Sequence, residues 1–377
     1  MRHSIRVPGA SPRSRHRILV DARPLQGPSA RRGIGRYLVG LLGGLEETRY
    51  RGQIGLLIDG GLEPPRLGGG GYVMFSVSRR YHGRFQAYED AVRLPRELER
   101  IGPSLYHATN LALPGPGRVP WVVTLHDLIP WALPGLKTLG ERIRYRPGRR
   151  RLAAASRIIA VSNSTATDAV RLAGVDRDRI EVVAEAVEPA FAPTSNASDR
   201  VASRFGLRQP YLLFAGALDR RKDPAALLTA WRTARQAVPS LQLALAGEPG
   251  RQAPSQMEGA RQLGYVGDAE LIDLLSAATA LIFPSRYEGF ALPPLEAMAC
   301  GCPVIAYANS SLPELVGEAG ILVADGDVAG LGRAAAEVAL NRDLADRLRS
   351  SGLTRARTYS WTDTARRTAA VYDRALS

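Results

Sequence analysis

Short apolar, β-branched runs alternate with amphipathic helical stretches along most of this 377-residue chain, and this alternation constrains the fold more than any other feature. Continuous apolar strands separated by helices are typical of a parallel sheet covered on both faces. We therefore predict an α/β protein with two doubly wound domains in tandem. Strands are predicted at residues 18–22, 54–59, 73–77, 104–107, 121–126, 157–162, 180–184, 211–215, 241–246, 280–283, 303–306 and 320–323. The clearest helices are predicted at 35–45, 162–174, 224–236, 268–278, 294–299, 328–340, 342–350 and 361–375.

A stretch rich in Pro, Ser, Ala and Asn separates the two halves and is predicted to be a linker. The length agrees with two domains, because roughly 100–200 residues are typical of one. Ligands of open parallel sheets bind beyond the carboxyl ends of the strands, so we expect two Rossmann-like domains facing an interdomain cleft. The predicted parts are a basic tail at 1–16, a first domain at 17–193, the linker at 194–209, a second domain at 210–358 and a final helix at 359–377 that crosses back to the first domain.

Composition excludes several classes of protein. No run approaches the 18 or so apolar residues that a transmembrane helix needs, and the basic N-terminus is followed only by the short apolar run Ile18–Val20, which is too brief for a signal peptide. The two cysteines, Cys300 and Cys302, are separated by one residue, which excludes a disulfide framework and a four-cysteine zinc site. We expect a cytoplasmic protein, since this cysteine usage fits a reducing compartment.

The formal net charge of +14 is concentrated in one half of the chain. Residues 1–193 carry an excess of 13 positive charges, whereas residues 194–377 carry an excess of one. Only two of the 50 basic residues are lysines, Lys137 and Lys222, so a lysine at a given site is a distinctive choice. The two halves are therefore expected to have different partners.

The strongest chemical signal lies in the segment Ser285–Val304. A predicted strand ends at Pro284, a glycine-containing loop follows, and Pro293-Pro294 then begins a helix, as proline does at the first helical position. Backbone N–H groups at such a helix start suit a phosphate group. Two carboxylates, Glu288 and Glu296, accompany this loop and can accept hydrogen bonds from sugar or ribose hydroxyls.

A second signal follows the first predicted strand of the second half. Gly216 comes directly after this strand, and the basic turn Arg220-Arg221-Lys222 precedes the next helix. Cations at this place can neutralise a departing diphosphate. The alternative interpretation is a solvated basic turn.

The segment around Glu288 and Glu296 resembles the E-x7-E signature of retaining glycosyltransferases with the GT-B architecture, and most closely family 4. The resemblance covers most of residues 205–358 and is weaker over 17–193. It implies that Glu288 contacts hydroxyls of the donor sugar and Glu296 the ribose of the nucleotide. It also implies donor contacts by Gly289, Phe290, Ala291 and Leu292, by Gly216, and by the backbone at Val266 against the nucleobase.

The same resemblance assigns Lys222 to the donor diphosphate. The arginine that the family places shortly after this strand is replaced by Ala217, so Arg221 or Arg220 is expected to act instead. No Asp-x-Asp pattern of the sequence makes a convincing metal site. We therefore expect neither a metal nor a cofactor, with the nucleotide sugar as co-substrate.

Candidate residues of the first half also follow predicted strands. His126 and Asp127 end an apolar strand, and His126 resembles the family histidine near the donor sugar. Gly33 and Gly35 lie between the first strand and the first helix, where a phosphate or the acceptor is expected to approach the backbone. The dinucleotide fingerprint is incomplete because position 38 is leucine, which disfavours nicotinamide chemistry. His107 serves either to support the site or to pack the core.

The predicted reaction transfers a sugar, with mannose from GDP-mannose as the expected donor, to a glycan or lipid-linked acceptor, with retention of configuration. The first domain is expected to receive the acceptor, and its positive charge suits an anionic membrane surface, so we expect peripheral association with the inner membrane face. Three alternatives stay open: a sugar-nucleotide epimerase of the same architecture, a basic protein that binds nucleic acid or an anionic surface, and a catalytically inactive binding module. Nucleic acid is not expected as a partner, because no helix-turn-helix, RNA-binding or zinc pattern accompanies the basic run of arginines from Arg142 to Arg151.

Overall fold

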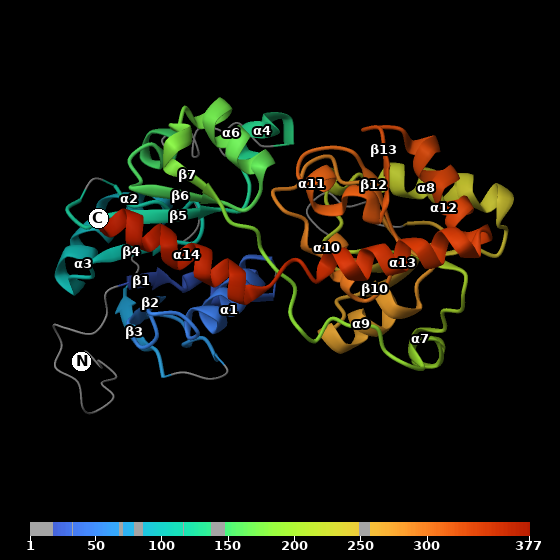
Figure 1. The fold of residues 1–377 in the computed structure, drawn as a ribbon, viewed down its shortest axis with the longest axis horizontal. Helices are drawn as coiled ribbons and strands as arrows, with labels where there is room; N and C mark the ends of the chain where they lie inside the picture. The colour runs from blue at the N-terminus through green and yellow to red at the C-terminus, as the bar shows by residue number, and fades with distance from the viewer. Residues whose placement is uncertain are drawn as a thin grey trace. The chain divides into compact units, whose positions relative to one another are not determined.

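The computed structural model describes residues 18–31, 33–67, 71–78, 86–115, 117–136, 148–248 and 257–377. The chain forms two compact units, each built around one parallel sheet (Figure 1). Unit 1 comprises Met1–Ala186 and Trp361–Ser377, and unit 2 comprises Val187–Ser360. The predicted basic tail at 1–16, Lys137 and the first part of the arginine run lie outside the described residues. Two doubly wound α/β domains, as the sequence predicts, are therefore confirmed.

The sheet of unit 1 has seven parallel strands in the order β3-β2-β1-β4-β5-β6-β7. The strand order reverses direction between β1 and β4, and the carboxyl ends of strands at such a reversal point are where open α/β sheets bind ligands. The strands are β1 (Ile18–Asp21), β2 (Ile54–Asp59), β3 (Val73–Val77), β4 (Leu105–Ala108), β5 (Trp121–Leu125), β6 (Arg157–Ala160) and β7 (Ile180–Val182). The helices are α1 (Gly33–Leu45), α2 (Gln86–Val92), α3 (Leu94–Ile101), α4 (Ile129–Ala132), α6 (Asn163–Ala173) and α14 (Trp361–Leu376).

Helix α14 comes from the end of the chain but belongs to unit 1, where it lies along α1 and across the strands (Figure 1). Small residues on α1 allow this close packing, because a Cβ atom on Gly40 would lie 2.1 Å from the indole ring of Trp361. At the other end of α14, Tyr372 is fully buried against Tyr50 and His107. The last helix therefore supplies part of the core of the first sheet.

The sheet of unit 2 has six parallel strands in the order β10-β9-β8-β11-β12-β13, with the reversal between β8 and β11. The strands are β8 (Tyr211–Ala215), β9 (Gln242–Ala246), β10 (Arg261–Gly264), β11 (Ala280–Phe283), β12 (Val304–Tyr307) and β13 (Ile321–Val323). The helices are α7 (Ala197–Phe205), α8 (Pro224–Ala237), α9 (Asp268–Ala277), α10 (Leu292–Ala299), α11 (Leu312–Val316), α12 (Val328–Leu340) and α13 (Arg342–Ala356). None of the helices in the described ranges combines the length and the apolar character needed to cross a membrane.

Two segments differ from the sequence-based expectation. Residues 194–209, expected as a linker, contain α7, whose Ala197 and Val201 are buried one helical turn apart and which ends at Gly206 in the left-handed conformation. Because this stretch is mostly polar, its short amphipathic helix could not be recognised from composition. Strand β10 was not expected, because it lies at the edge of the sheet, none of its residues is buried and it carries no apolar run.

Two glycines of α1 are expected to respond in opposite ways to alanine. A Cβ atom on the buried Gly35 would lie 2.1 Å from the carbonyl oxygen of Ala30, whereas nothing lies within 4 Å of one on the exposed Gly43. Gly35→Ala should therefore lower the free energy of unfolding by about 2 kcal/mol through overpacking, and Gly43→Ala should raise it by about 1 kcal/mol through helix propensity. Urea denaturation of both variants measures this. Equal effects of the two substitutions would contradict the packing assigned to Gly35.

Candidate active site

The candidate site of unit 2 lies beyond the carboxyl ends of β8 and β11, where the strand order reverses. Gly216 follows β8 with a φ of 122°, and Gly247 follows β9 with a φ of 146°. Residues that have a Cβ atom rarely adopt these backbone conformations. The two backbones are in contact, since a Cβ atom on Gly247 would lie 2.1 Å from the carbonyl oxygen of Gly216. A Cβ atom on Gly216 would lie 3.8 Å from Nζ of Lys222. Because these two glycines have no side chains, space remains at the end of β8 beside Lys222.

A short 3-10 turn, η6 (Arg220–Lys222), holds the cations of the site. The carboxylate of Asp219 accepts hydrogen bonds from the backbone N–H groups of Arg221 at 3.0 Å and of Lys222 at 3.2 Å. These bonds orient both basic residues at the end of β8. Arg220, on the same turn, is exposed. Of the two candidate arginines, Arg221 is the one that contacts Glu288.

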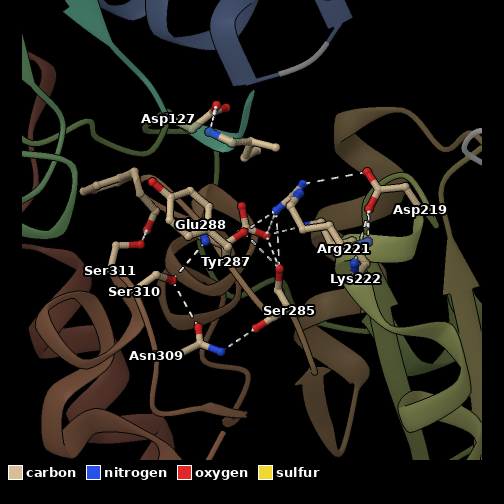
Figure 2. Close-up of polar contacts among 12 residues, drawn as sticks. Asp127, Asp219, Arg221, Lys222, Ser285, Tyr287, Glu288, Asn309, Ser310 and Ser311 are labelled. Carbon is tan, nitrogen blue, oxygen red and sulfur yellow. Dashed lines mark hydrogen bonds and ion pairs between the residues drawn. The ribbon is translucent and has the colours of Figure 1, made fainter. Parts of the chain in front are cut away.

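The carboxylate of Glu288 lies between two cations (Figure 2). Its Oε1 is 2.9 Å from Nζ of Lys222 and 2.5 Å from Nη1 of Arg221, and it accepts a hydrogen bond from Oγ of Ser285 at 2.7 Å. The backbone N–H of Glu288 donates to Oγ of Ser310 at 2.9 Å. Loops after β8, β11 and β12 thus converge on Glu288.

The charges of this cluster are strongly coupled. Burial alone would raise the pKa of Glu288, but the charges of Arg221 and Lys222 and the hydrogen bonds from Lys222 and Ser285 lower it to about 2. Burial lowers the pKa of Lys222, an effect that Glu288 opposes. Nζ of Lys222 also lies 4.1 Å from the centre of the Phe283 ring, a cation–π contact. Asp219 lies 3.9 Å from Nη2 of Arg221, so two carboxylates and two cations are gathered at the end of β8.

Helix α10 begins beside this cluster. Ala291, its N-cap, has a φ of 82°, and proline stands in its first turn. Oγ of Ser311 donates to the carbonyl oxygen of Phe290 at 3.1 Å, which fixes the loop before the helix. Because Pro293 and Pro294 carry no N–H group, the backbone donors that this helix start can offer to a phosphate group are limited to Leu292 and the loop before it. Glu296 is buried on α10, and Val266 is half-buried between β10 and α9.

In unit 1, His126 follows β5 and pairs with a residue that the sequence did not single out. Nδ1 of His126 lies 2.6 Å from Oε1 of Glu185, which follows β7. The ring of Tyr37 contacts the imidazole edge-on, with the ring centres 4.7 Å apart. Asp127 accepts a hydrogen bond from the backbone N–H of Ile129 at 3.0 Å and thereby supports the start of α4. Gly33 is the exposed first residue of α1, and Gly35 is buried against the preceding turn.

A buried polar chain lies next to this pair. Nε2 of His107 is 2.8 Å from Oγ1 of Thr124, which is itself 2.8 Å from the hydroxyl of Tyr37. Nδ1 of His107 is 2.7 Å from the hydroxyl of Tyr372 on α14. His107 is therefore fully hydrogen-bonded within unit 1, which favours the structural interpretation over a direct role. Thr124 and Tyr372 carried no signal in the sequence, because they look like ordinary core residues.

The burial of His107 predicts a pH dependence of stability. Burial, with a smaller contribution from His126, lowers the pKa of His107 to about 3. In the unfolded chain the imidazole binds its proton near pH 6.5, so between these values the unfolded state binds more protons and stability falls as the pH falls. We expect the difference in unfolding free energy between the protein and its His107→Gln variant to shrink by up to about 1.4 kcal/mol per pH unit below pH 6.5. Denaturant titrations from pH 7.5 to 5 measure this, and a constant difference would refute it.

In the described part of the chain, no group of three or more His, Cys, Asp or Glu side chains is arranged to hold a metal ion. The two thiols are buried, and burial raises the pKa of Cys300 and of Cys302 to about 12. Both belong to the packing at the end of α10, as the sequence predicts.

Comparison with known families matches both halves of the chain. Residues 195–355 match the family described as "Glycosyl transferases group 1", and residues 31–191 match "Glycosyltransferase Family 4". The chain is 31% identical over 317 residues to the O-antigen chain mannosyltransferase B of Escherichia coli, covering 80% of each protein. It is 26% identical to the serotype-specific mannosyltransferase WbdA of Escherichia coli, over 92% of this chain and 47% of that protein, so it spans about half the length of this relative.

Solved structures share the fold. Sucrose-phosphate synthase from Thermosynechococcus elongatus superposes with a TM-score of 0.77 at 20% identity, over 95% of this chain and 98% of that one. WaaG, a glycosyltransferase involved in lipopolysaccharide biosynthesis, superposes with a TM-score of 0.74 at 15% identity, over 94% of this chain and 99% of that one. At these identities the likeness concerns the architecture.

Proposed function

We propose that this chain, which belongs to the group 1 glycosyltransferases, transfers mannose from GDP-mannose to a glycan or lipid-linked acceptor with retention of configuration. Its first half matches family 4 and its architecture is GT-B. The mannosyltransferase relatives support mannose as the sugar. The observation that carries the proposal is the cluster of Glu288 with Lys222 and Arg221 at the reversal point of the second sheet. It combines a sugar-binding carboxylate with two cations for a diphosphate.

The proposed chemistry follows from these charges. The bond between the anomeric carbon and the diphosphate breaks, and the electron pair leaves with the phosphate oxygen. Lys222 and Arg221 stabilise the negative charge that develops there, together with the loop before α10. The acceptor hydroxyl attacks from the same face, and its proton passes to the departing phosphate. Glu288 accepts hydrogen bonds from hydroxyls of the donor sugar and Glu296 from the ribose.

Two cations beside the leaving group support turnover without a divalent metal. We expect activity to be unchanged by EDTA, because positive side chains can supply the charge that a metal ion supplies elsewhere. Loss of activity in EDTA with recovery on adding Mg²⁺ or Mn²⁺ would contradict this. The location that we propose is cytoplasmic, with peripheral binding to anionic lipid through the positive charge of the first half.

The donor is tested by thermal-shift measurements with GDP, UDP, dTDP and ADP. A nucleotide at 100 times its dissociation constant stabilises the folded state by about 2.7 kcal/mol. We expect GDP to produce the largest shift, and transfer from GDP-mannose to be seen only when an acceptor is added. A larger shift with UDP would overturn the proposed donor. Conversion of the nucleotide sugar without any acceptor would instead favour an epimerase.

A further inference from the structure

The pairing of His126 with Glu185 is built by the sheet of unit 1. His126 follows β5 and Glu185 follows β7, and these two strands flank β6. The backbone before Glu185 is held by α14, since Oγ1 of Thr364 donates to the carbonyl oxygen of Ala184 at 2.8 Å. Only 4% of Glu185 is exposed. The carboxylate is therefore fixed at the carboxyl end of the sheet before any substrate binds.

The contact between the two side chains decides where the imidazole proton sits. An ionised carboxylate accepts hydrogen bonds and has no proton to donate. When Glu185 is ionised, the proton in the 2.6 Å contact between Nδ1 of His126 and Oε1 of Glu185 therefore belongs to Nδ1. In a neutral imidazole the other nitrogen then carries a lone pair and acts as an acceptor.

That other nitrogen, Nε2 of His126, is buried and has no hydrogen-bond partner among the described residues. Buried polar atoms in folded proteins nearly always have a partner, so an exception calls for an explanation. Among the described residues, the imidazole contacts Oε1 of Glu185 and, edge-on, the ring of Tyr37. Its electrostatic neighbour His107 is neutral at physiological pH because its pKa is about 3. None of them fills the role of a donor to Nε2.

We propose that Glu185 is a positioning residue that holds the proton on Nδ1 of His126, so that Nε2 accepts a hydrogen bond from a hydroxyl group of a bound sugar substrate. This inference rests on the proposed glycosyltransferase function and adds a residue to it. A carboxylate at position 185 would fix both the ring orientation and the tautomer. A glutamine there can donate to Nδ1 as well as accept, so it permits the opposite tautomer, in which Nε2 carries the proton.

The tautomer can be observed directly in the full-length protein. Selective ¹⁵N labelling of histidine distinguishes protonated from unprotonated ring nitrogens, and the signals of His126 are those lost in the His126→Gln variant. At pH 7.5 we expect Nδ1 to be protonated and Nε2 unprotonated in the wild type. In Glu185→Gln we expect the proton to appear on Nε2. A wild-type spectrum with Nε2 protonated, alone or together with Nδ1, would overturn the proposal.

Kinetics provide the second measurement. Loss of a partner that orients a functional histidine is expected to lower kcat/KM about 10- to 100-fold, and Glu185→Asp, which keeps the carboxylate, should recover more than half of the lost activity on a logarithmic scale. The matched control is Glu181→Gln, because Glu181 lies on β7 and pairs with Arg374 at 3.0 Å at the surface. Its activity should stay within about twofold of the wild type. If Glu185→Gln behaves like this control, Glu185 does not position His126.

The two measurements separate this proposal from the proposed function. Transfer from a nucleotide sugar other than GDP-mannose would overturn the proposed donor, while the comparison of Glu185 variants could be made with that donor instead. If no donor is used at all, the glycosyltransferase proposal fails, and the histidine spectrum of the wild type still decides the tautomer. If Glu185→Gln does not fold, the wild-type spectrum and the Glu185→Asp variant carry the test.

Discussion

Glu288→Gln is expected to lower kcat/KM for sugar transfer by about 100- to 1,000-fold, the range seen when one preorganised group at a transition state is removed. The amide cannot balance Lys222 and Arg221, and it accepts weaker hydrogen bonds from sugar hydroxyls. Steady-state kinetics with donor and acceptor measure the loss. The matched control is Asp273→Asn in the same unit, which breaks an ion pair between α9 and Arg200 of α7 and should leave activity unchanged.

Glu288→Gln is also expected to change the free energy of unfolding and its dependence on pH. Removing one partner of a buried ion pair leaves an uncompensated charge, so we expect the free energy of unfolding to fall by about 3 kcal/mol at pH 7. Because the pKa of Glu288 is about 2 in the folded state and ordinarily 4.5, its contribution is fully present above pH 4.5 and is lost as the pH falls toward 2. The stability difference between wild type and variant should therefore shrink over that window. A difference that does not change with pH would contradict the ion-pair assignment.

Lys222→Met should produce the second large effect, a loss of about 100-fold in kcat. Lys222 is only 6% exposed, and its ammonium group contacts both Glu288 and the ring of Phe283. Methionine fills a similar volume without charge, so the diphosphate that we propose leaves at this site would lose one of its two cations. The pKa of Glu288 should rise in this variant, because one of the charges that lowers it is gone.

Lys222→Arg tests the shape of the site. The ammonium lies close to Gly216 and to an aromatic ring, and a planar guanidinium is larger and donates in a fixed geometry. We expect arginine to restore less than a tenth of the wild-type kcat, about 1.4 kcal/mol in transition-state free energy. The control is Arg232→Met, which removes an exposed cation of the same unit and should have no effect. Full activity of Lys222→Arg would show that charge alone suffices.

Much of the fold could be predicted because buried parallel strands leave continuous apolar runs, and all of the strands predicted from such runs are present within one or two residues. Segments whose burial depends on their neighbours could not be predicted. Helix α7 has a polar composition and buries only a narrow face, and β10 is a polar edge strand. The conformations of α7 and β10 are stabilised by the elements that they pack against.

For the candidate site, the contact between Glu288 and Lys222 could be anticipated, because both follow strands and the carboxyl ends of neighbouring parallel strands meet at one edge of the sheet. The choice between Arg220 and Arg221 could not be made, since both occupy one short turn and only its capping by Asp219 orients them. Glu185 was missed for a similar reason. It lies 59 residues from His126 in sequence, and their contact depends on the order of strands in the sheet.

The position of α14 has a consequence for how the protein is made. Unit 1 takes its last helix from the end of the chain, after all of Val187–Ser360. At about 5–20 residues per second, a ribosome needs roughly 10 to 35 seconds to synthesise the intervening residues of unit 2. During that time the first sheet exposes the surface that Trp361 and Tyr372 later cover. Unit 2 is continuous in sequence, so all of its residues are synthesised before the last helix of unit 1.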